Sequence, residues 1–250
     1  MASLFSVFMQ VYSNKRAVFE SLKSLRTFYR DVAVRVVSDD GENFSEICNA
    51  FNATFVHSPT RIVAGSSSAG FVSGGLQEYL IRLYDHCIAT NAEWVIIFES
   101  DVRLIRHFRS FPETEAAGPR MNLFSIELNQ WLVRQFGSRP YGYGMSGGSV
   151  FRRESFIKAY RSGTSIERYA IYDSRLPKYG DMALTLLFYL NGYDFSVWSE
   201  VSELFHEDSP IIRDAAMDHA YKYWYDKPFD IAMLEIAEDG SRTMHGLHLV

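Results

Sequence analysis

The 250-residue chain has few cysteines and no excess of basic residues. Its two cysteines, Cys48 and Cys87, are too few for a disulfide framework or a cysteine-rich zinc site. Lysine and arginine number 25 against 30 aspartates and glutamates, which gives a net charge of -5 and no overall basic field. This balance argues against nucleic acid as the main partner.

The sequence also lacks long apolar runs, internal repeats and low-complexity segments. The amino terminus, residues 1–12, has an apolar run too short to span a bilayer, and no basic residue precedes this run as in a signal peptide. No other window approaches the roughly 18 uncharged apolar residues of a membrane-spanning helix. We therefore expect no transmembrane segment and a cytoplasmic location.

The first part of the chain alternates between patterns typical of strands and of helices. Hydrophobic residues make up 47% of the sequence, enough for one large domain with a sizeable core. The patterns predict strands at 6–11, 32–37, 53–56 and 94–98, and helices at 17–29, 45–51 and 76–90. Such alternation predicts an α/β fold, with a mostly parallel central sheet flanked by helices.

The second part is less regular and predicts a smaller, mixed sheet. We expect strands at 121–126, 195–198 and 202–205, and helices at 154–160, 181–191 and 211–225. A glycine-dense loop lies at 141–149. Glycine at this density is typical of backbone packed closely against a ligand, and equally of a tight bend between elements.

The most informative stretch is the apolar run Trp94–Phe98, which ends abruptly in Glu99-Ser100-Asp101. Five apolar residues in a row are typical of a strand buried on both faces. Ligands bind at the carboxyl ends of such strands, and paired carboxylates suit a hard divalent cation. The alternative is that the strand simply ends in polar loop residues.

Further polar and glycine signals follow the predicted strands or open the predicted helices. They are Asp39 and Asp40 after a strand, Gly147 and Gly148 before Phe151-Arg152-Arg153, Gly180 and Asp181 at a helix start, and His206 after a strand. Each signal alone has an ordinary structural explanation, such as a turn, a helix cap or a solvated surface residue. Their order and spacing carry more information than any one of them.

In that order and spacing, the chain from Ser6 to about Glu207 resembles the GT-A glycosyltransferases, most closely those similar to glycosyltransferase family 2. The resemblance implies a single GT-A, Rossmann-like domain over 1–250. About 1–110 would bind the nucleotide-sugar and about 111–250 the acceptor. It implies an inverting transfer of a hexosyl or pentosyl group from a nucleoside-diphosphate sugar, with a UDP-sugar favoured, to a glycan or other hydroxyl acceptor.

The resemblance also implies a divalent cation, Mn²⁺ or Mg²⁺. Asp101 would coordinate it, and Glu99 would bind it through water or hold the ribose. His206 would be the third protein ligand. The rival histidine is His219, three residues from Lys222 on the predicted last helix, and His245 and His248 are weaker options.

The remaining roles concern the donor and the proton. Asp39 or Asp40 would accept a hydrogen bond from the nucleotide base or ribose. Ser100, Gly147, Gly148 and Arg153 would also contact the donor. Asp181 would be the general base that takes the proton from the acceptor hydroxyl.

The chain departs from the family pattern at two positions, which keeps two alternatives open. Glu99 stands where the family has the first aspartate, and Gly180 stands where it has a glutamate. A catalytically silent sugar-binding protein of the same fold is therefore one alternative. A nucleotidyltransferase is the other, although the turn Tyr12-Ser13-Asn14-Lys15 after the first strand lacks the glycine-rich phosphate loop of that class.

Overall fold

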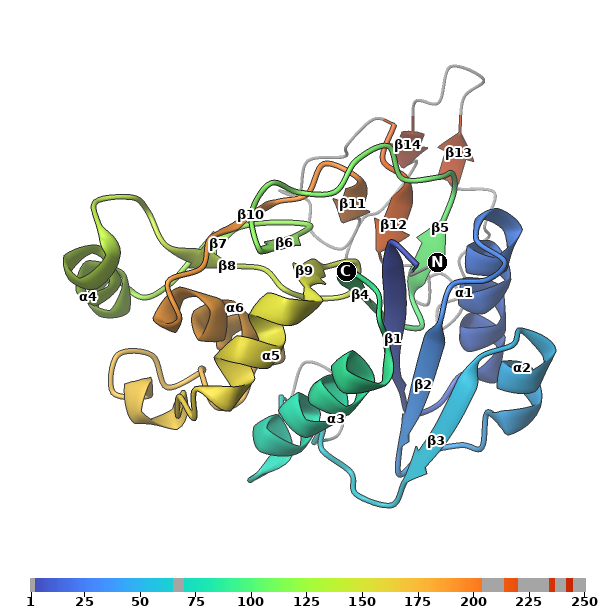
Figure 1. Cartoon of the computed structure of the whole chain (residues 1–250), viewed down its shortest axis with the longest axis horizontal. Helices are drawn as coiled ribbons and strands as arrows, with labels where there is room; N and C mark the ends of the chain where they lie inside the picture. The colour runs from blue at the N-terminus through green and yellow to red at the C-terminus, as the bar shows by residue number, and fades with distance from the viewer. Residues whose placement is uncertain (1–2, 65–69, 204–213, 220–233, 237–241, 245–250) are drawn as a thin grey trace.

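The centre of the molecule is a seven-stranded sheet (Figure 1). The computed structural model describes residues 3–64, 70–203, 214–219, 234–236 and 242–244. In their order across the sheet, the strands are β10 (Phe195–Val197), β6 (Ala116–Gly118), β9 (Val150–Arg152), β4 (Trp94–Phe98), β1 (Phe5–Val11), β2 (Val34–Asp39) and β3 (Thr54–Ser58).

The first half of the chain forms the parallel part of this sheet. β1 pairs in parallel with both β2 and β4, and β2 pairs in parallel with β3. Three helices make the crossovers between these strands: α1 (Lys15–Phe28), α2 (Ser45–Ala50) and α3 (Gly75–Ala89). The predicted alternation of strands and helices is confirmed over this half.

Alternation of side chains along β1 divides the core into two layers. Val7 and Met9 pack in the cluster that contains Leu22 of α1, whereas Phe8 packs in the cluster that contains Leu80 of α3. Successive side chains of a strand point to opposite faces, so the two helices cover opposite faces of the sheet. Asn14 caps α1, since its side-chain oxygen accepts a hydrogen bond from the Ala17 amide at 3.0 Å.

The second half adds the antiparallel part. β9 lies between β4 and β6 and runs antiparallel to both, while β6 and β10 are parallel to each other. Helices α5 (Arg153–Arg161) and α6 (Gly180–Leu190) contact each other and α3, so they lie on the α3 face of the sheet (Figure 1). Eight successive residues of α6, 182–189, are buried, which makes this helix a central part of the core.

A smaller sheet follows the carboxyl end of β4. It consists of β11 (Val201–Glu203), β12 (Met217–His219) and β5 (Val102–Leu104), in that order. β11 and β12 are parallel, and β12 and β5 are antiparallel. Two strand pairs complete the structure: β7 (Asn122–Leu123) with β8 (Gly142–Tyr143), and β13 (Leu234–Ile236) with β14 (Arg242–Met244).

Two predictions of local structure are wrong. Of the helix predicted at 211–225, the structure describes 214–219, where Met217–His219 is the strand β12, because pairing with β5 and β11 overrides the local helical pattern. The strand predicted at 121–126 is only β7, and helix α4 (Ile126–Phe136) follows it. A signal for α4 was present, since Ser125 is a good cap and its hydroxyl accepts from the Leu128 amide at 3.3 Å.

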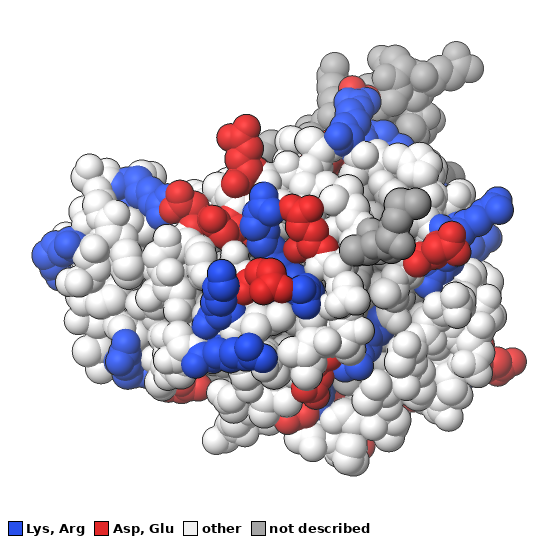
Figure 2. All heavy atoms as spheres, in the orientation of Figure 1, with Lys and Arg blue, Asp and Glu red and all other residues white. Residues whose placement is uncertain are grey.

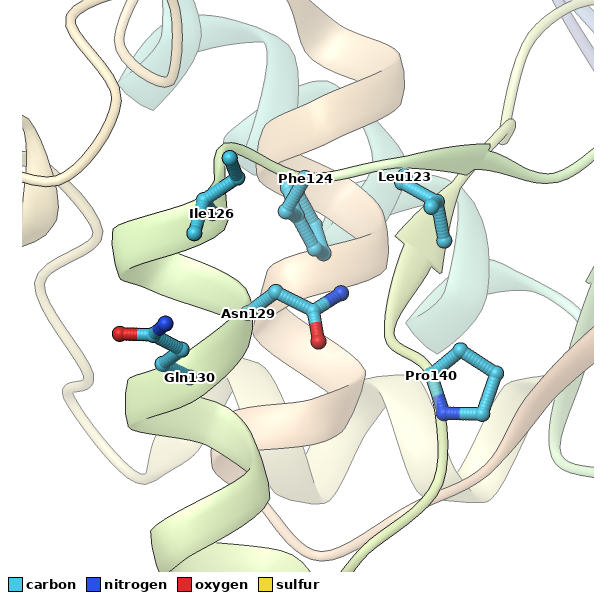
Figure 3. A pocket seen from close by; sticks show the side chains of 6 residues that line it. All are labelled: Leu123, Phe124, Ile126, Asn129, Gln130 and Pro140. Atoms are coloured by element: carbon cyan, nitrogen blue, oxygen red, sulfur yellow. The ribbon is translucent and has the colours of Figure 1, made fainter.

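α4 and the segments beside it enclose a small apolar pocket. Figure 3 shows its lining residues, which are Leu123, Phe124, Ile126, Asn129, Gln130 and Pro140. None of them is a predicted site residue. The face shown in Figure 2 has acidic and basic side chains next to one another near its middle, without a broad field of one sign. Among the described residues, every helix is too short or too polar to cross a membrane.

Candidate active site

Glu99, Asp101 and His219 form a compact cluster of ligand-type atoms. One such atom from each residue lies within 4.8 Å of the other two. His219 Nε2 is 3.6 Å from Asp101 Oδ1 and 3.8 Å from Glu99 Oε2. Asp101 and His219 are buried, with exposed fractions of 2% and 3%, whereas Glu99 is half-buried. Two predicted residues and one rival candidate are thus brought together.

Strand pairing brings these distant residues side by side. Glu99 and Asp101 follow β4, and β5 begins directly after Asp101 at Val102. In the antiparallel pair of β12 with β5, His219 lies opposite Val102. The cluster therefore lies at the carboxyl end of a central strand, where open α/β sheets bind their ligands.

The side chains of this cluster fit a divalent cation. Carboxylate oxygens suit Mg²⁺ and Mn²⁺, and imidazole widens the range to other first-row metals. Space beside these side chains is left open because residue 147 is a glycine. A Cβ at this position would lie only 2.8 Å from His219 Nε2 and 3.0 Å from Glu99 Cγ. Any side chain at position 147 would fill the space next to the ligating atoms. Glu99, Asp101 and His219 are therefore the residues that could hold the ion.

Glu203 and Arg120 lie behind His219. Glu203 Oε1 is 3.6 Å from His219 Nδ1, and Arg120 forms an ion pair with the same Glu203 oxygen. Burial by itself raises the pKa of Glu203, but His219 and Arg120 outweigh burial and hold this pKa below its usual range. Glu203 is thus an ionised carboxylate inside the protein.

Asp181 lies in the first turn of α6, as predicted. Its Oδ1 accepts a hydrogen bond from the Met182 amide at 2.8 Å, and its Oδ2 is 3.5 Å from Arg120 Nη2. Burial raises the pKa of the Asp181 carboxyl, although Arg120 opposes this rise. Arg120 therefore joins Asp181 to Glu203, and so to the cluster of Glu99, Asp101 and His219.

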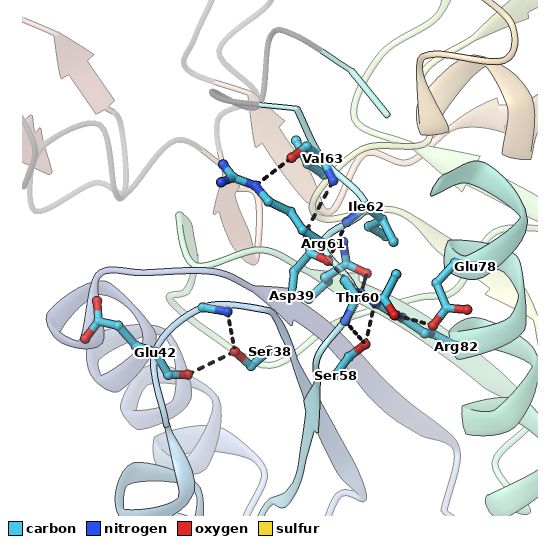
Figure 4. A network of polar contacts seen from close by, with 12 residues as sticks. Ser38, Asp39, Glu42, Ser58, Thr60, Arg61, Ile62, Val63, Glu78 and Arg82 are labelled. Carbon is cyan, nitrogen blue, oxygen red and sulfur yellow. Dashed lines mark hydrogen bonds and ion pairs between the residues drawn. The ribbon is translucent and has the colours of Figure 1, made fainter. Parts of the chain in front are cut away.

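The two candidate aspartates at the carboxyl end of β2 have different surroundings. Asp39 is buried, and its carboxylate accepts hydrogen bonds from the amides of Ile62 and Val63 and from Arg82 (Figure 4). Its two oxygens are therefore engaged within the chain. Asp40 is exposed and has a left-handed backbone, with φ of 55°. Of the two, Asp40 has the carboxylate that a ligand can approach.

The glycine-rich loop reaches the cluster, whereas the arginine after it does not. The Gly148 amide donates to the Ile97 carbonyl at 2.7 Å, which holds the loop at the carboxyl end of β4 near the buried Ser100. β9 then runs antiparallel to β4, so Arg153 lies near its amino end and donates to the carbonyls of Cys87 and Thr90. β4 is five residues long, which is roughly 17 Å at about 3.3 Å per residue.

The position of Arg153 therefore corrects one prediction. Its guanidinium fixes the end of α3 and does not join the cluster, because β9 runs away from the acidic end of β4. His206, the favoured third ligand, lies outside the described residues. His219 is present in the cluster, on a strand and not on the helix that suggested it. The sequence offered His219 only as a rival, through its helical spacing from Lys222, and it is strand pairing that places it beside Asp101.

We expect the stability of the cation-free protein to fall as the pH rises from about 6.5 to about 10. Burial alone lowers the pKa of His219, but Asp101, Glu203 and Glu99 outweigh it and raise this pKa from 6.5 to about 10. The folded chain therefore binds this proton more tightly than the unfolded chain, so stabilisation is full below 6.5 and disappears as the pH passes through about 10.

Urea unfolding with a chelator, at several values across this pH range, measures the effect. Other groups also titrate there, so the informative quantity is the difference between wild type and His219→Asn. The wild type should lose more stability than the variant over the range. Equal losses would contradict the charged imidazole.

Comparisons with known proteins give similarity at the level of structure alone. No family model and no curated protein matches the sequence. Similar solved structures include the galactosyltransferase LgtC in complex with donor and acceptor sugar analogues, with 13% identity and a TM-score of 0.49 over 86% of each chain. They also include the glycosyltransferase GlyE of Streptococcus pneumoniae TIGR4, with 14% identity and a TM-score of 0.45.

The overlap with GlyE covers 79% of this chain and 45% of that one, so the chain spans less than half of the GlyE structure. A further similar structure is TarS of S. aureus, with 15% identity and a TM-score of 0.41, over 80% of this chain and 37% of that one. Overlaps this partial carry no inference about activity. The class of the molecule follows from its own features: an α/β protein with a carboxylate–histidine cluster at the carboxyl end of its central strand.

Proposed function

We propose that the chain is a metal-dependent glycosyltransferase that moves a sugar from a nucleoside-diphosphate sugar to an acceptor hydroxyl. The observation that carries the proposal is the cluster of Glu99, Asp101 and His219 at the carboxyl end of β4. The resemblance of the motif order to the GT-A glycosyltransferases supports the same reaction. On this proposal the half before about residue 110 binds the donor, with a UDP-sugar favoured.

In this proposal, the cluster of Glu99, Asp101 and His219 promotes release of the nucleoside diphosphate, which is the leaving group. When bound, a divalent cation supplies positive charge to the phosphate oxygens on which negative charge grows as the glycosidic bond breaks. The buried Asp101 and His219 and the half-buried Glu99 are the residues that would hold it. Asp40, Ser100, Gly147 and Gly148 are the other proposed donor contacts, from the same end of β2 and β4.

Asp181 accepts the proton of the acceptor hydroxyl in this proposal. The acceptor oxygen forms the new bond to the anomeric carbon, the bond to the diphosphate breaks, and the proton passes to the Asp181 carboxylate. Burial raises the pKa of that carboxyl toward working pH, which suits a general base, while Arg120 opposes the rise. Attack opposite the leaving group inverts the anomeric carbon.

A thermal-shift screen tests the donor half of the proposal. UDP-, GDP-, CMP- and dTDP-sugars are each added with and without Mn²⁺ or Mg²⁺. Ligands that bind only the folded state raise the melting temperature by mass action, so no acceptor is needed. We expect a rise for one nucleotide, and only when the metal is present.

The control for this screen is the metal alone. A rise with the metal that no nucleotide increases would favour a metal-binding protein without a nucleotide-sugar donor. No rise with any combination would contradict the proposal.

A further inference from the structure

We propose that Glu203 is a positioning residue of the metal site: held by Arg120, it orients the His219 imidazole so that Nε2 is offered to the cation. The inference rests on the proposed function, because it requires that Glu99, Asp101 and His219 bind a divalent ion. It adds two residues that no sequence motif indicated. Its evidence is the arrangement of four charged side chains around one buried imidazole.

The strand register places Glu203 next to His219. In the parallel pair of β11 with β12, Glu203 is the partner of His219, so their side chains project from the same face. Glu203 Oε1 lies 3.6 Å from Nδ1, while Asp101 Oδ1 and Glu99 Oε2 lie 3.6 and 3.8 Å from Nε2. The two ring nitrogens therefore face different carboxylates.

Because Glu203 faces the other ring nitrogen, its role differs from that of Asp101 and Glu99. The two nitrogens lie on different edges of the ring, so a cation bound to Nε2 has the imidazole between itself and Glu203. The ligand-type atoms that lie within 4.8 Å of one another accordingly come from Glu99, Asp101 and His219, and not from Glu203. Glu203 acts on the ion through the histidine, as carboxylates behind metal-bound histidines commonly do.

The choice of which imidazole nitrogen carries the proton explains how Glu203 would act. A neutral imidazole has one N–H and one lone pair, and a cation needs the lone pair. The Glu203 carboxylate favours the N–H at Nδ1, which leaves the lone pair at Nε2. A carboxylate in this position also makes the ring a stronger donor to the metal.

Arg120 keeps Glu203 in place. The Glu203 side chain is 1% exposed, and a buried carboxylate is costly unless it is paired. Arg120 supplies the ion pair to Oε1 and also lies 3.5 Å from Asp181 Oδ2. One guanidinium thus supports the residue behind the metal ligand and the proposed base, which ties the two functional groups together.

Mn²⁺ binding to the full chain tests this inference without any sugar or turnover. Free Mn²⁺ is followed by electron paramagnetic resonance, and pulsed measurements detect coupling of bound Mn²⁺ to the imidazole nitrogen. For Glu203→Gln we expect affinity lower by about 10- to 100-fold, the range for loss of a supporting partner, together with altered nitrogen coupling. His219→Gln gives the reference spectrum without that nitrogen.

Glu200→Gln is the matched control. Glu200 is also a buried carboxylate of this region, and its Oε2 pairs with Arg106 Nη1 at 2.9 Å. Its substitution removes a comparable ion pair at a residue outside the proposed site, so it should lower stability and leave Mn²⁺ affinity and nitrogen coupling unchanged. If Glu203→Gln fails to fold, Glu203→Asp replaces it, because it keeps a charge for Arg120 and draws the carboxylate back from Nδ1.

The outcomes separate this inference from the proposed function. Nitrogen coupling in the wild type that is unchanged in Glu203→Gln and Glu203→Asp would overturn the role of Glu203 alone. An equal loss of Mn²⁺ affinity in Glu200→Gln would also overturn the role of Glu203, since loss of any buried ion pair in this region would then have the same effect. Wild-type protein that binds no Mn²⁺ would overturn both the role of Glu203 and the metal site itself.

Discussion

Replacing Asp101 by Asn should abolish metal-dependent donor binding. Asp101 is the most buried carboxylate of the cluster, and the substitution keeps its shape while it removes the charge that faces the cation. Loss of a direct ligand should exceed the roughly 100-fold upper range for a supporting partner. Titration calorimetry with Mn²⁺, and then with the donor in the presence of Mn²⁺, measures both steps.

Glu93→Gln is the control for this experiment, because it removes a carboxylate at the other end of the same strand. Glu93 Oε1 pairs with Arg152 Nη1 at 2.6 Å, beside the first residue of β4. This variant should bind Mn²⁺ and donor as the wild type does. Unchanged binding in Asp101→Asn would refute the metal assignment, and with it the main support for the proposed function.

Replacing Asp181 by Asn should slow transfer by about 10²- to 10⁴-fold and leave donor affinity nearly unchanged. Asparagine can still accept from the Met182 amide, as Asp181 does now at 2.8 Å, but it cannot take the proton of the acceptor hydroxyl. Single-turnover rates at saturating donor isolate this step from product release.

Asp173→Asn is the matched control for the proposed base. Asp173 is a buried carboxylate paired with Arg175 at 2.8 Å, much as Asp181 is paired with Arg120. Its substitution should lower stability and keep the transfer rate. Transfer by Asp181→Asn at the wild-type rate would show that the proton goes elsewhere, and would favour a retaining mechanism.

Together the two variants distinguish donor binding from chemistry. Asp101→Asn should lose metal and donor affinity, whereas Asp181→Asn should lose rate alone. A chain that binds donor with metal but transfers to no acceptor, even with both residues intact, would be the catalytically silent protein that the departures at Glu99 and Gly180 left open.

The parallel half of the sheet could be predicted because its elements depend on local patterns. α1 begins where Asn14 offers a capping side chain, and β4 is an uninterrupted apolar run. The carboxylates after β4 were predicted to bind metal for the same reason, since the strand and the acids after it are adjacent in the sequence. The later elements depend on pairing with distant segments, and there the predictions failed more often.

Met217–His219 is the clearest example of such a failure. Its local pattern indicated a helix, but hydrogen bonds to β5 and β11 make it a strand. That pairing brings His219 to Asp101 from a strand, whereas the sequence had placed it on a helix face with Lys222. Arg153 shows the same limit, because the antiparallel course of β9 takes it to the far end of β4.

By itself, the sequence determined the α/β class, the parallel β-α-β units and the pair Glu99 and Asp101 at the end of the central strand. Periodicity and capping act within a few residues, so one segment contains the information. Only the tertiary structure decided the partners of that pair: His219 from β12, Glu203 behind it, and Arg120 between Glu203 and Asp181. These contacts join residues up to 118 positions apart, as for Asp101 and His219, and strand register and burial of charge determine them.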